Sequence, residues 1–104
     1  MTIELFGETL DIAFNLAVQV TYEQITGEDF DLEATKKISN AVALYYAAIL
    51  ANNPDTKITM NDLMRKATAN DVTTIANAVS VSVNEWCTGA KPSTDEAPED
   101  EKNA

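Results

Sequence analysis

The acidic segment at residues 28–33 is where residue types and spacing first suggest chemistry. It reads Glu-Asp-Phe-Asp-Leu-Glu, and carboxylates at alternate positions supply the oxygen ligands that a hard cation such as Ca²⁺ prefers. A calcium loop beginning at Asp29 needs glycine at its sixth position and glutamate at its twelfth, where the chain has Ala34 and Asn40. We therefore expect no metal site here and assign these acids to the start of a helix, whose dipole favours negative charge.

The only cysteine, Cys87, is the second candidate for chemistry. It follows Glu85 and Trp86 near the predicted C-terminal end of a helix. A reactive thiolate needs a nearby cation or a helix N-terminus, and the sequence around Cys87 predicts neither. We interpret this residue as a structural or incidental thiol.

The composition excludes several classes of protein. The 104 residues contain no histidine, one cysteine and three glycines that lie far apart, which excludes histidine-dependent triads, thiolate zinc sites and glycine-rich phosphate loops. With 17 Asp+Glu against 7 Lys+Arg, the net charge is −10, which opposes binding to a phosphate backbone. No two acids stand out as a hydrolytic pair. We predict that the protein is not an enzyme and has no catalytic residue, no cofactor and no nucleic-acid partner.

Charge and composition divide the chain into two parts. Residues 90–104 contain five acids, two lysines, two prolines and no large apolar side chain, so we expect a disordered acidic tail. Residues 1–89 carry 12 acids and five bases, a net charge of −7, and we predict one helical domain there. The longest apolar run, 41–51, is shorter than the roughly 20 residues that span a bilayer. The N-terminus has no basic region, so we expect a cytoplasmic protein without membrane contact.

Period-2 alternation at the N-terminus predicts a β-hairpin. Apolar residues occupy alternate positions on both sides of a turn predicted at Gly7-Glu8, namely Ile3, Leu5, Leu10, Ile12 and Phe14. An isolated hairpin is only marginally stable in water, so we expect its apolar face to dock on the rest of the domain.

Residues 15–26 fit two interpretations. The alternation continues to Tyr22, which would extend the second strand to about 13 residues, well beyond the usual length. In the helical interpretation, Asn15 is the N-cap and Gly27 is the C-terminal stop. One helical face then carries Val18, Tyr22 and Ile25. We favour the helix.

Three further helices are predicted. Asp31 is placed to cap a helix that runs to about Asn52, and residues 41–51 are apolar nearly all round that helix, which is typical of the centre of a bundle. Thr59, with Asp62 three residues later, has the spacing of a capping box and predicts a short helix.

The last helix is predicted to begin after Asn70 or Asp71 and to end at Gly89. Its apolar stripe consists of Val72, Ile75, Ala76, Val79, Val83 and Trp86. The predicted fold is therefore mainly α: a small four-helix domain with a short N-terminal β-hairpin and a disordered acidic C-terminal tail.

Three segments resemble a known family when taken in order. Residues 14–18 read Phe-Asn-Leu-Ala-Val, residues 22–27 read Tyr-Glu-Gln-Ile-Thr-Gly, and residues 44–48 read Leu-Tyr-Tyr-Ala-Ala. Between an N-terminal hairpin and two further helices, they resemble the small tail assembly chaperones of long-tailed bacteriophages and related prophages. The resemblance spans residues 3–88.

The resemblance implies a non-enzymatic protein of the bacterial host cytoplasm that is absent from the finished virion. Such proteins bind the long, apolar, helical tape measure protein, keep it soluble and help recruit tail tube subunits around it. Many of them are also made in a longer, frameshifted form. A large negative charge would keep a crowded array of such chaperones soluble.

A chaperone of this kind would bind an apolar helix through an apolar groove on its own helices. As candidate groove residues we select Tyr46, Leu50, Met60, Met64 and Trp86. Two other classes stay open: an acidic inhibitor that mimics nucleic acid, motivated by the charge of −10, and a small helical adaptor or dimerisation domain. The sequence does not fix the oligomeric state, so a homo-oligomer also stays open.

Overall fold

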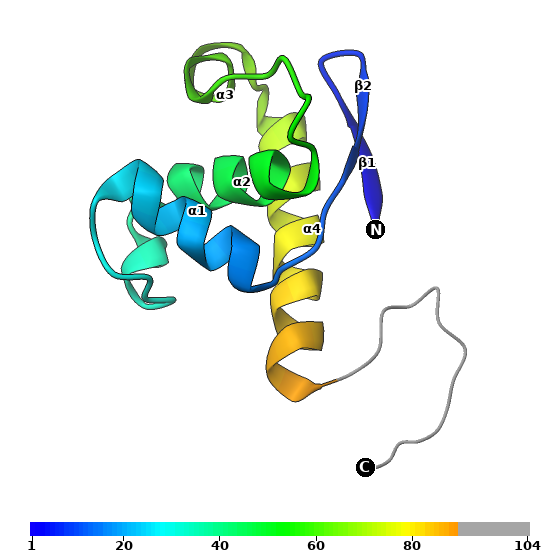
Figure 1. Ribbon diagram of the computed structural model, residues 1–104. Helices are drawn as coiled ribbons and strands as arrows, with labels where there is room; N and C mark the ends of the chain where they lie inside the picture. Colours follow the sequence, from blue (N-terminus) through cyan, green and yellow to red (C-terminus); the bar gives the residue numbers. More distant parts are fainter. Residues whose placement is uncertain (90–104) are drawn as a thin grey trace.

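A computed structural model of the chain describes residues 1–89, and the predicted acidic tail at 90–104 lies outside the described residues. The elements in chain order are β1 (Thr2–Leu5), β2 (Glu8–Asp11), α1 (Leu16–Thr26), the 3₁₀ turn η1 (Ala34–Lys36), α2 (Ile38–Asn52), α3 (Met60–Lys66) and α4 (Ala69–Thr88) (Figure 1). The prediction of a mainly α domain with four α-helices and an N-terminal hairpin is confirmed.

Helix α2 lies at the centre of the domain. It contacts α1, α3, α4 and β2, and Figure 1 shows it crossing α4 with α1 alongside. Its buried residues are Ala43, Leu44, Ala47, Ala48 and Ile49. Because partners surround this helix on several sides, an apolar sequence nearly all round it is stable here, as predicted.

Strands β1 and β2 form an antiparallel hairpin whose turn differs from the prediction by one position. Leu5 pairs with Glu8, so the turn residues are Phe6 and Gly7, with φ angles of 50° and 81°. Positive φ at both positions is the geometry of a type I′ turn, which matches the twist of the flanking strands. The predicted turn at Gly7-Glu8 is therefore wrong, and Glu8 begins β2.

The apolar face of the hairpin docks on the helices, as expected. Its alternating residues Ile3, Leu5, Leu10, Ile12 and Phe14 are all buried. β1 contacts α4, and β2 contacts α2. The end of α2 also holds the segment that follows β2, because Asn52 Nδ2 donates to the carbonyl oxygen of Ala13 at 2.8 Å.

Helix α1 begins and ends where the helical interpretation of residues 15–26 predicts. Asn15 Oδ1 accepts a hydrogen bond from the Val18 N–H at 3.1 Å, and Gly27, with φ of 73°, ends the helix. Val18 and Tyr22 are buried where α1 packs against α2. The extended-strand alternative is wrong, because the cap satisfies an N–H group at the helix start and the helix buries its apolar face against α2.

The helix predicted to begin at Asp31 begins instead at Ile38. Residues 31–37 form i to i+3 hydrogen bonds, and the carboxylate of Asp31 accepts from the Glu33 N–H at 3.0 Å, closing a local turn. Just before this turn, Phe30 packs edge-on against Tyr22 of α1 with ring centroids 5.2 Å apart. That contact holds the loop back on α1, so the chain bends before α2 can start.

Helices α3 and α4 both begin with capping boxes. Thr59 and Asp62 form the predicted box of α3. Thr68 and Asp71 form a second box, so α4 starts at Ala69, slightly earlier than predicted. In each box the hydroxyl and the carboxylate satisfy backbone N–H groups that a helix start leaves without partners.

The buried face of α4 is rotated relative to the predicted apolar stripe. Ala78 and Ser82 are buried together with Ile75 and Val79, whereas the two ends of the stripe, Val72 and Trp86, are 43% and 48% exposed. α4 packs against α2 and β1, and these neighbours cover its middle and leave both ends partly open.

Candidate functional site

Exposed apolar side chains come from many segments of residues 1–89. The large ones are Met1, Phe6, Leu16, Val20, Leu32, Ile38, Met64, Val72, Val81 and Trp86. Single exposed apolar side chains are normal in globular proteins and need no functional explanation. An exposed side chain becomes informative when it is held rigidly beside a cavity, and Trp86 meets both conditions.

A row of four aromatic rings holds Trp86 in place. Trp86 packs edge-on against Phe14, with ring centroids 5.4 Å apart and an interplanar angle of 81°. Phe14 in turn packs against Phe30 at 5.5 Å, and Phe30 against Tyr22 at 5.2 Å. Phe14 and Tyr22 are buried, so the exposed ring at the end of the row rests on a fixed base.

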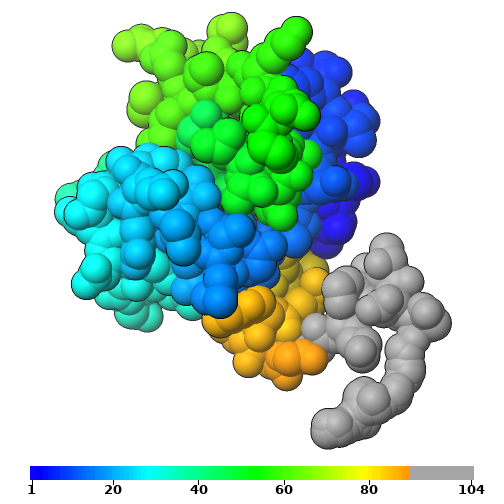
Figure 2. All heavy atoms as spheres, viewed as in Figure 1, coloured from blue at the N-terminus to red at the C-terminus, as the bar shows by residue number. Residues whose placement is uncertain are grey.

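A groove of about 280 Å³ lies beside this ring. One wall consists of Met1 and residues 12–14, and the other consists of Ser82, Glu85 and Trp86 from α4. On the face drawn in Figure 2, the C-terminal end of α4 (orange) lies against blue atoms from the N-terminal part of the chain. An apolar floor with one carboxylate and one buried hydroxyl is suited to binding an apolar side chain.

The structure separates the five predicted groove residues. Met60 is half-buried and Met64 is 62% exposed on α3, and α3 contacts α2 but not α4 among the elements of residues 1–89. Tyr46 and Leu50 lie one turn apart on α2 and are both half-buried. Trp86 lies at the end of α4 that points away from α3 (Figure 1). Of the five, Trp86 is the residue that lines the groove.

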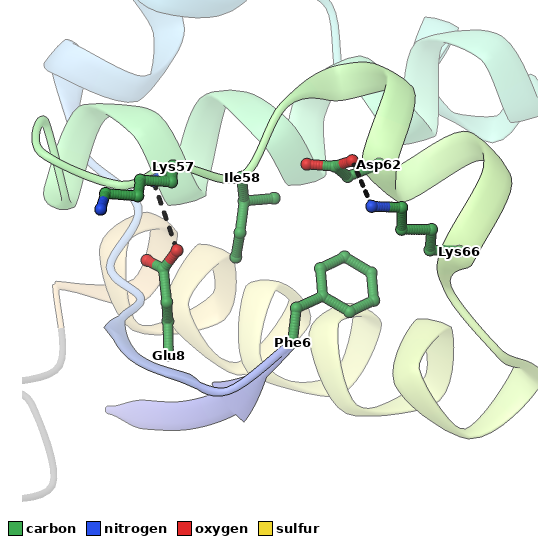
Figure 3. A pocket seen from close by; sticks show the side chains of 6 residues that line it. All are labelled: Phe6, Glu8, Lys57, Ile58, Asp62 and Lys66. Carbon is green, nitrogen blue, oxygen red and sulfur yellow. Dashed lines mark hydrogen bonds and ion pairs between the residues drawn. The ribbon is translucent and has the colours of Figure 1, made fainter.

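A second hollow, of about 350 Å³, lies between the hairpin turn and α3. Figure 3 shows Phe6 and Ile58 facing it, with Glu8, Lys57, Asp62 and Lys66 around the rim. The Glu8 carboxylate already accepts from Thr56 Oγ1 and from the Lys57 N–H. Asp62 is paired with Lys66 at 3.2 Å. The Glu8 carboxylate therefore connects the hairpin to the loop before α3, and the Asp62 carboxylate caps that helix. We assign this hollow a structural role.

The acids of the α1–α2 loop also have structural partners. The carboxylate of Glu23 accepts from the Phe30 N–H at 2.8 Å, and Asp31 closes the local turn described above. No group of three or more His, Cys, Asp or Glu side chains in residues 1–89 is placed to hold a metal ion.

Burial raises the pKa of the Tyr22 phenol above its ordinary value of 10.0, and the nearby charges of Glu28 and Asp31 add to the effect.

Comparisons with protein-family models, with curated proteins and with solved structures found no match for this chain. No helix within residues 1–89 is both long enough and apolar enough to cross a bilayer.

The sequence prediction missed the other residues of the groove. The sequence pattern places Ile12 and Phe14 in the hairpin, and it does not mark Ser82 as a binding residue. Their partners on the opposite wall are about 70 positions away along the chain, so no local pattern could pair them. The sequence contains one signal for Ser82. This polar residue lies seven positions after Ile75, so it falls on the same buried face of α4.

Proposed function

We propose that this protein is a non-enzymatic tail assembly chaperone, which binds the tape measure protein of a long-tailed bacteriophage or prophage and helps recruit tail tube subunits. The observation that carries the proposal is the setting of Trp86, which rests on buried Phe14 and stays 48% exposed beside an apolar groove. Rigid aromatic side chains of this kind supply much of the affinity of protein interfaces. The sequence resemblance supplies the identity of the partner.

The charge of the domain supports the same function. A protein that binds long apolar helices must stay soluble while its own apolar surface is exposed. A net charge of −7 over residues 1–89 favours this, because it makes copies repel one another at close range. The partner would lie across the groove as a helix and insert side chains from successive turns.

Co-expression with the tape measure protein encoded in the same genome tests the proposal. We expect the tape measure protein to be soluble and to co-purify with the chain, and to be insoluble when it is expressed alone. The proposal fails if its soluble fraction is the same with and without the chain. Because the resemblance also implies a gene order, a tape measure gene should lie downstream and a tail tube gene upstream.

A nucleic-acid-mimicking inhibitor is the second candidate. It is favoured by one observation: residues 1–35 contain eight acids and no lysine or arginine. Mimicry predicts binding to a basic DNA-handling protein that weakens steeply as the salt concentration rises. The chaperone function predicts a mainly apolar contact, which retains most of its affinity in salt.

A further inference from the structure

The two walls of the Trp86 groove come from segments whose side chains carry no positive charge. Residues 1–35, which supply one wall, contain eight acids and no lysine or arginine. Helix α4, which supplies the other, contains Asp71 and Glu85 and no basic residue. All five lysine and arginine side chains of residues 1–89 lie between positions 36 and 66.

One carboxylate is placed to act on a partner bound in the groove. Glu85 lines the groove itself and is adjacent in sequence to Trp86. This carboxylate has no lysine or arginine partner among the ion pairs of residues 1–89. The groove therefore has an apolar floor and one carboxylate without an ion-pair partner in its lining.

We infer that the Trp86 groove binds an apolar side chain of a partner helix that carries lysine or arginine one turn away. This inference rests on the proposed function, in which the partner helix is a segment of the tape measure protein. Apolar burial against Trp86 provides affinity, and the Glu85 carboxylate selects basic helices over acidic ones. A cavity of about 280 Å³ accommodates side chains while the partner backbone stays outside.

Residues 90–104 of the same chain do not have the chemistry of this occupant. They contain no large apolar side chain, and their five acids outnumber their two lysines. A second copy of the chain is a stronger competitor, because Met64 on α3 is 62% exposed and is followed by Arg65 and Lys66. Self-association through α3 is therefore a separate outcome that the experiment must distinguish.

Two synthetic helical peptides of about 20 residues test the inference with the full chain. Both carry the same leucine stripe and no tryptophan, and they differ only in having lysine or glutamate beside the stripe. Trp86 is the only tryptophan of the protein, so a shift in its emission reports occupation of the groove. The anisotropy of labelled peptide gives the affinity for every variant. We expect the lysine peptide to bind at least about tenfold more tightly than the glutamate peptide.

Variants locate the effect in the groove. Trp86→Ala should weaken binding of the lysine peptide at least about tenfold, and Glu85→Gln should weaken it about two- to fivefold. Val81→Ala is the matched control, because Val81 is 42% exposed on the same helix but lies about 140° away from Trp86 around its axis. Glu85→Lys should reverse the preference, so that the glutamate peptide binds more tightly than the lysine peptide. This test does not depend on whether Trp86→Ala folds.

Equal binding of the two peptides, or no effect of Glu85→Lys, would overturn the inference. So would a Met64→Asp variant that dissociates a dimer and exposes Trp86 in the absence of peptide, since the occupant would then be a second copy.

The proposed function can fail independently of this inference. If wild-type chain does not solubilise the tape measure protein but selects the lysine peptide, the groove is right and the function is wrong. If Trp86→Ala still solubilises the tape measure protein, the groove is wrong and the function stands.

Discussion

The side-chain amide of Asn53 is hydrogen-bonded to both backbone groups of Asp11. Asn53 Oδ1 accepts from the Asp11 N–H at 2.9 Å, and Asn53 Nδ2 donates to the Asp11 carbonyl oxygen at 2.8 Å. The second Nδ2 hydrogen is used within the helix, since Nδ2 also donates to the Ile49 carbonyl at 2.8 Å. The amide thus forms with Asp11 the two backbone hydrogen bonds that a neighbouring strand would form, and it fixes the hairpin to the end of α2.

Replacement of Asn53 by alanine should destabilise the domain by about 1–2 kcal/mol, because several hydrogen bonds are lost at a site that water can partly reach. Urea unfolding followed by circular dichroism measures the change. Asn77→Ala is the control, since Asn77 is exposed on α4 and alanine is the better helix former. Equal unfolding midpoints for the two variants would show that the amide does not anchor the hairpin.

Thr68→Ala should cost about 1 kcal/mol, as is usual for the loss of an N-cap. The Thr68 hydroxyl accepts from the Asp71 N–H at 3.1 Å, and the Asp71 carboxylate accepts from the Thr68 N–H at 3.0 Å. Thr68→Ser keeps the cap and should be close to wild type. Thermal unfolding of both variants checks this, and a Thr68→Ser variant as unstable as Thr68→Ala would contradict the capping role.

Asp62 should make the stability of α3 depend on pH in the acid range. The hydrogen bond from the Thr59 N–H, and then Lys66, hold the pKa of this carboxyl below its ordinary value of 3.8. Its ionised form is therefore the one the fold stabilises, so the stabilisation is complete above the ordinary pKa and is lost as the pH falls through the lower pKa of the folded state. The difference in Tm between wild type and Asp62→Ala should be largest near neutral pH and should shrink on acidification. A difference that is constant with pH would rule out this role.

Tyr22→Phe should leave the fold intact and raise its stability by about 1 kcal/mol. The Tyr22 side chain is fully buried, and its hydroxyl has no hydrogen-bond partner among residues 1–89. A buried polar group without a partner costs free energy that phenylalanine does not. Because the pKa of the Tyr22 phenol is raised in the folded state, this phenol ionises first in the unfolded chain as the pH rises above 10.0. The stability of the fold therefore falls as the pH rises there.

The Tyr22→Phe variant should therefore lose less stability than wild type between neutral and alkaline pH. Chemical unfolding at both pH values measures this. A variant less stable than wild type at neutral pH would mean that the hydroxyl has a partner.

The features that could be predicted from sequence are those whose physical cause is local. The Asn15 cap, the Thr59–Asp62 box and the glycine stops all depend on groups within a few residues of one another. The period of the hairpin was equally visible, because strand burial follows every second residue. These signals were sufficient for the fold class and for most element boundaries.

The features that could not be predicted depend on contacts between distant segments. The turn before α2 follows from the packing of Phe30 on α1, and the Asn53–Asp11 bonds join residues 42 positions apart. For the candidate site, the sequence identified Trp86 but grouped it with Met60 and Met64, which lie on a helix that does not contact α4 within residues 1–89. Which exposed side chains share a surface is decided by tertiary packing, and composition carries no information about it.

The absence of lysine from both walls of the Trp86 groove also decides which reagents can detect a partner there. Amine-directed cross-linkers would find no lysine side chain on either wall, because all lysines of residues 1–89 lie between positions 36 and 66. Trypsin would likewise leave residues 1–35 and α4 uncut. The exposed thiol of Cys87, next to Trp86, is the one cysteine of the protein. A photoreactive label attached there would map the neighbours of the groove directly.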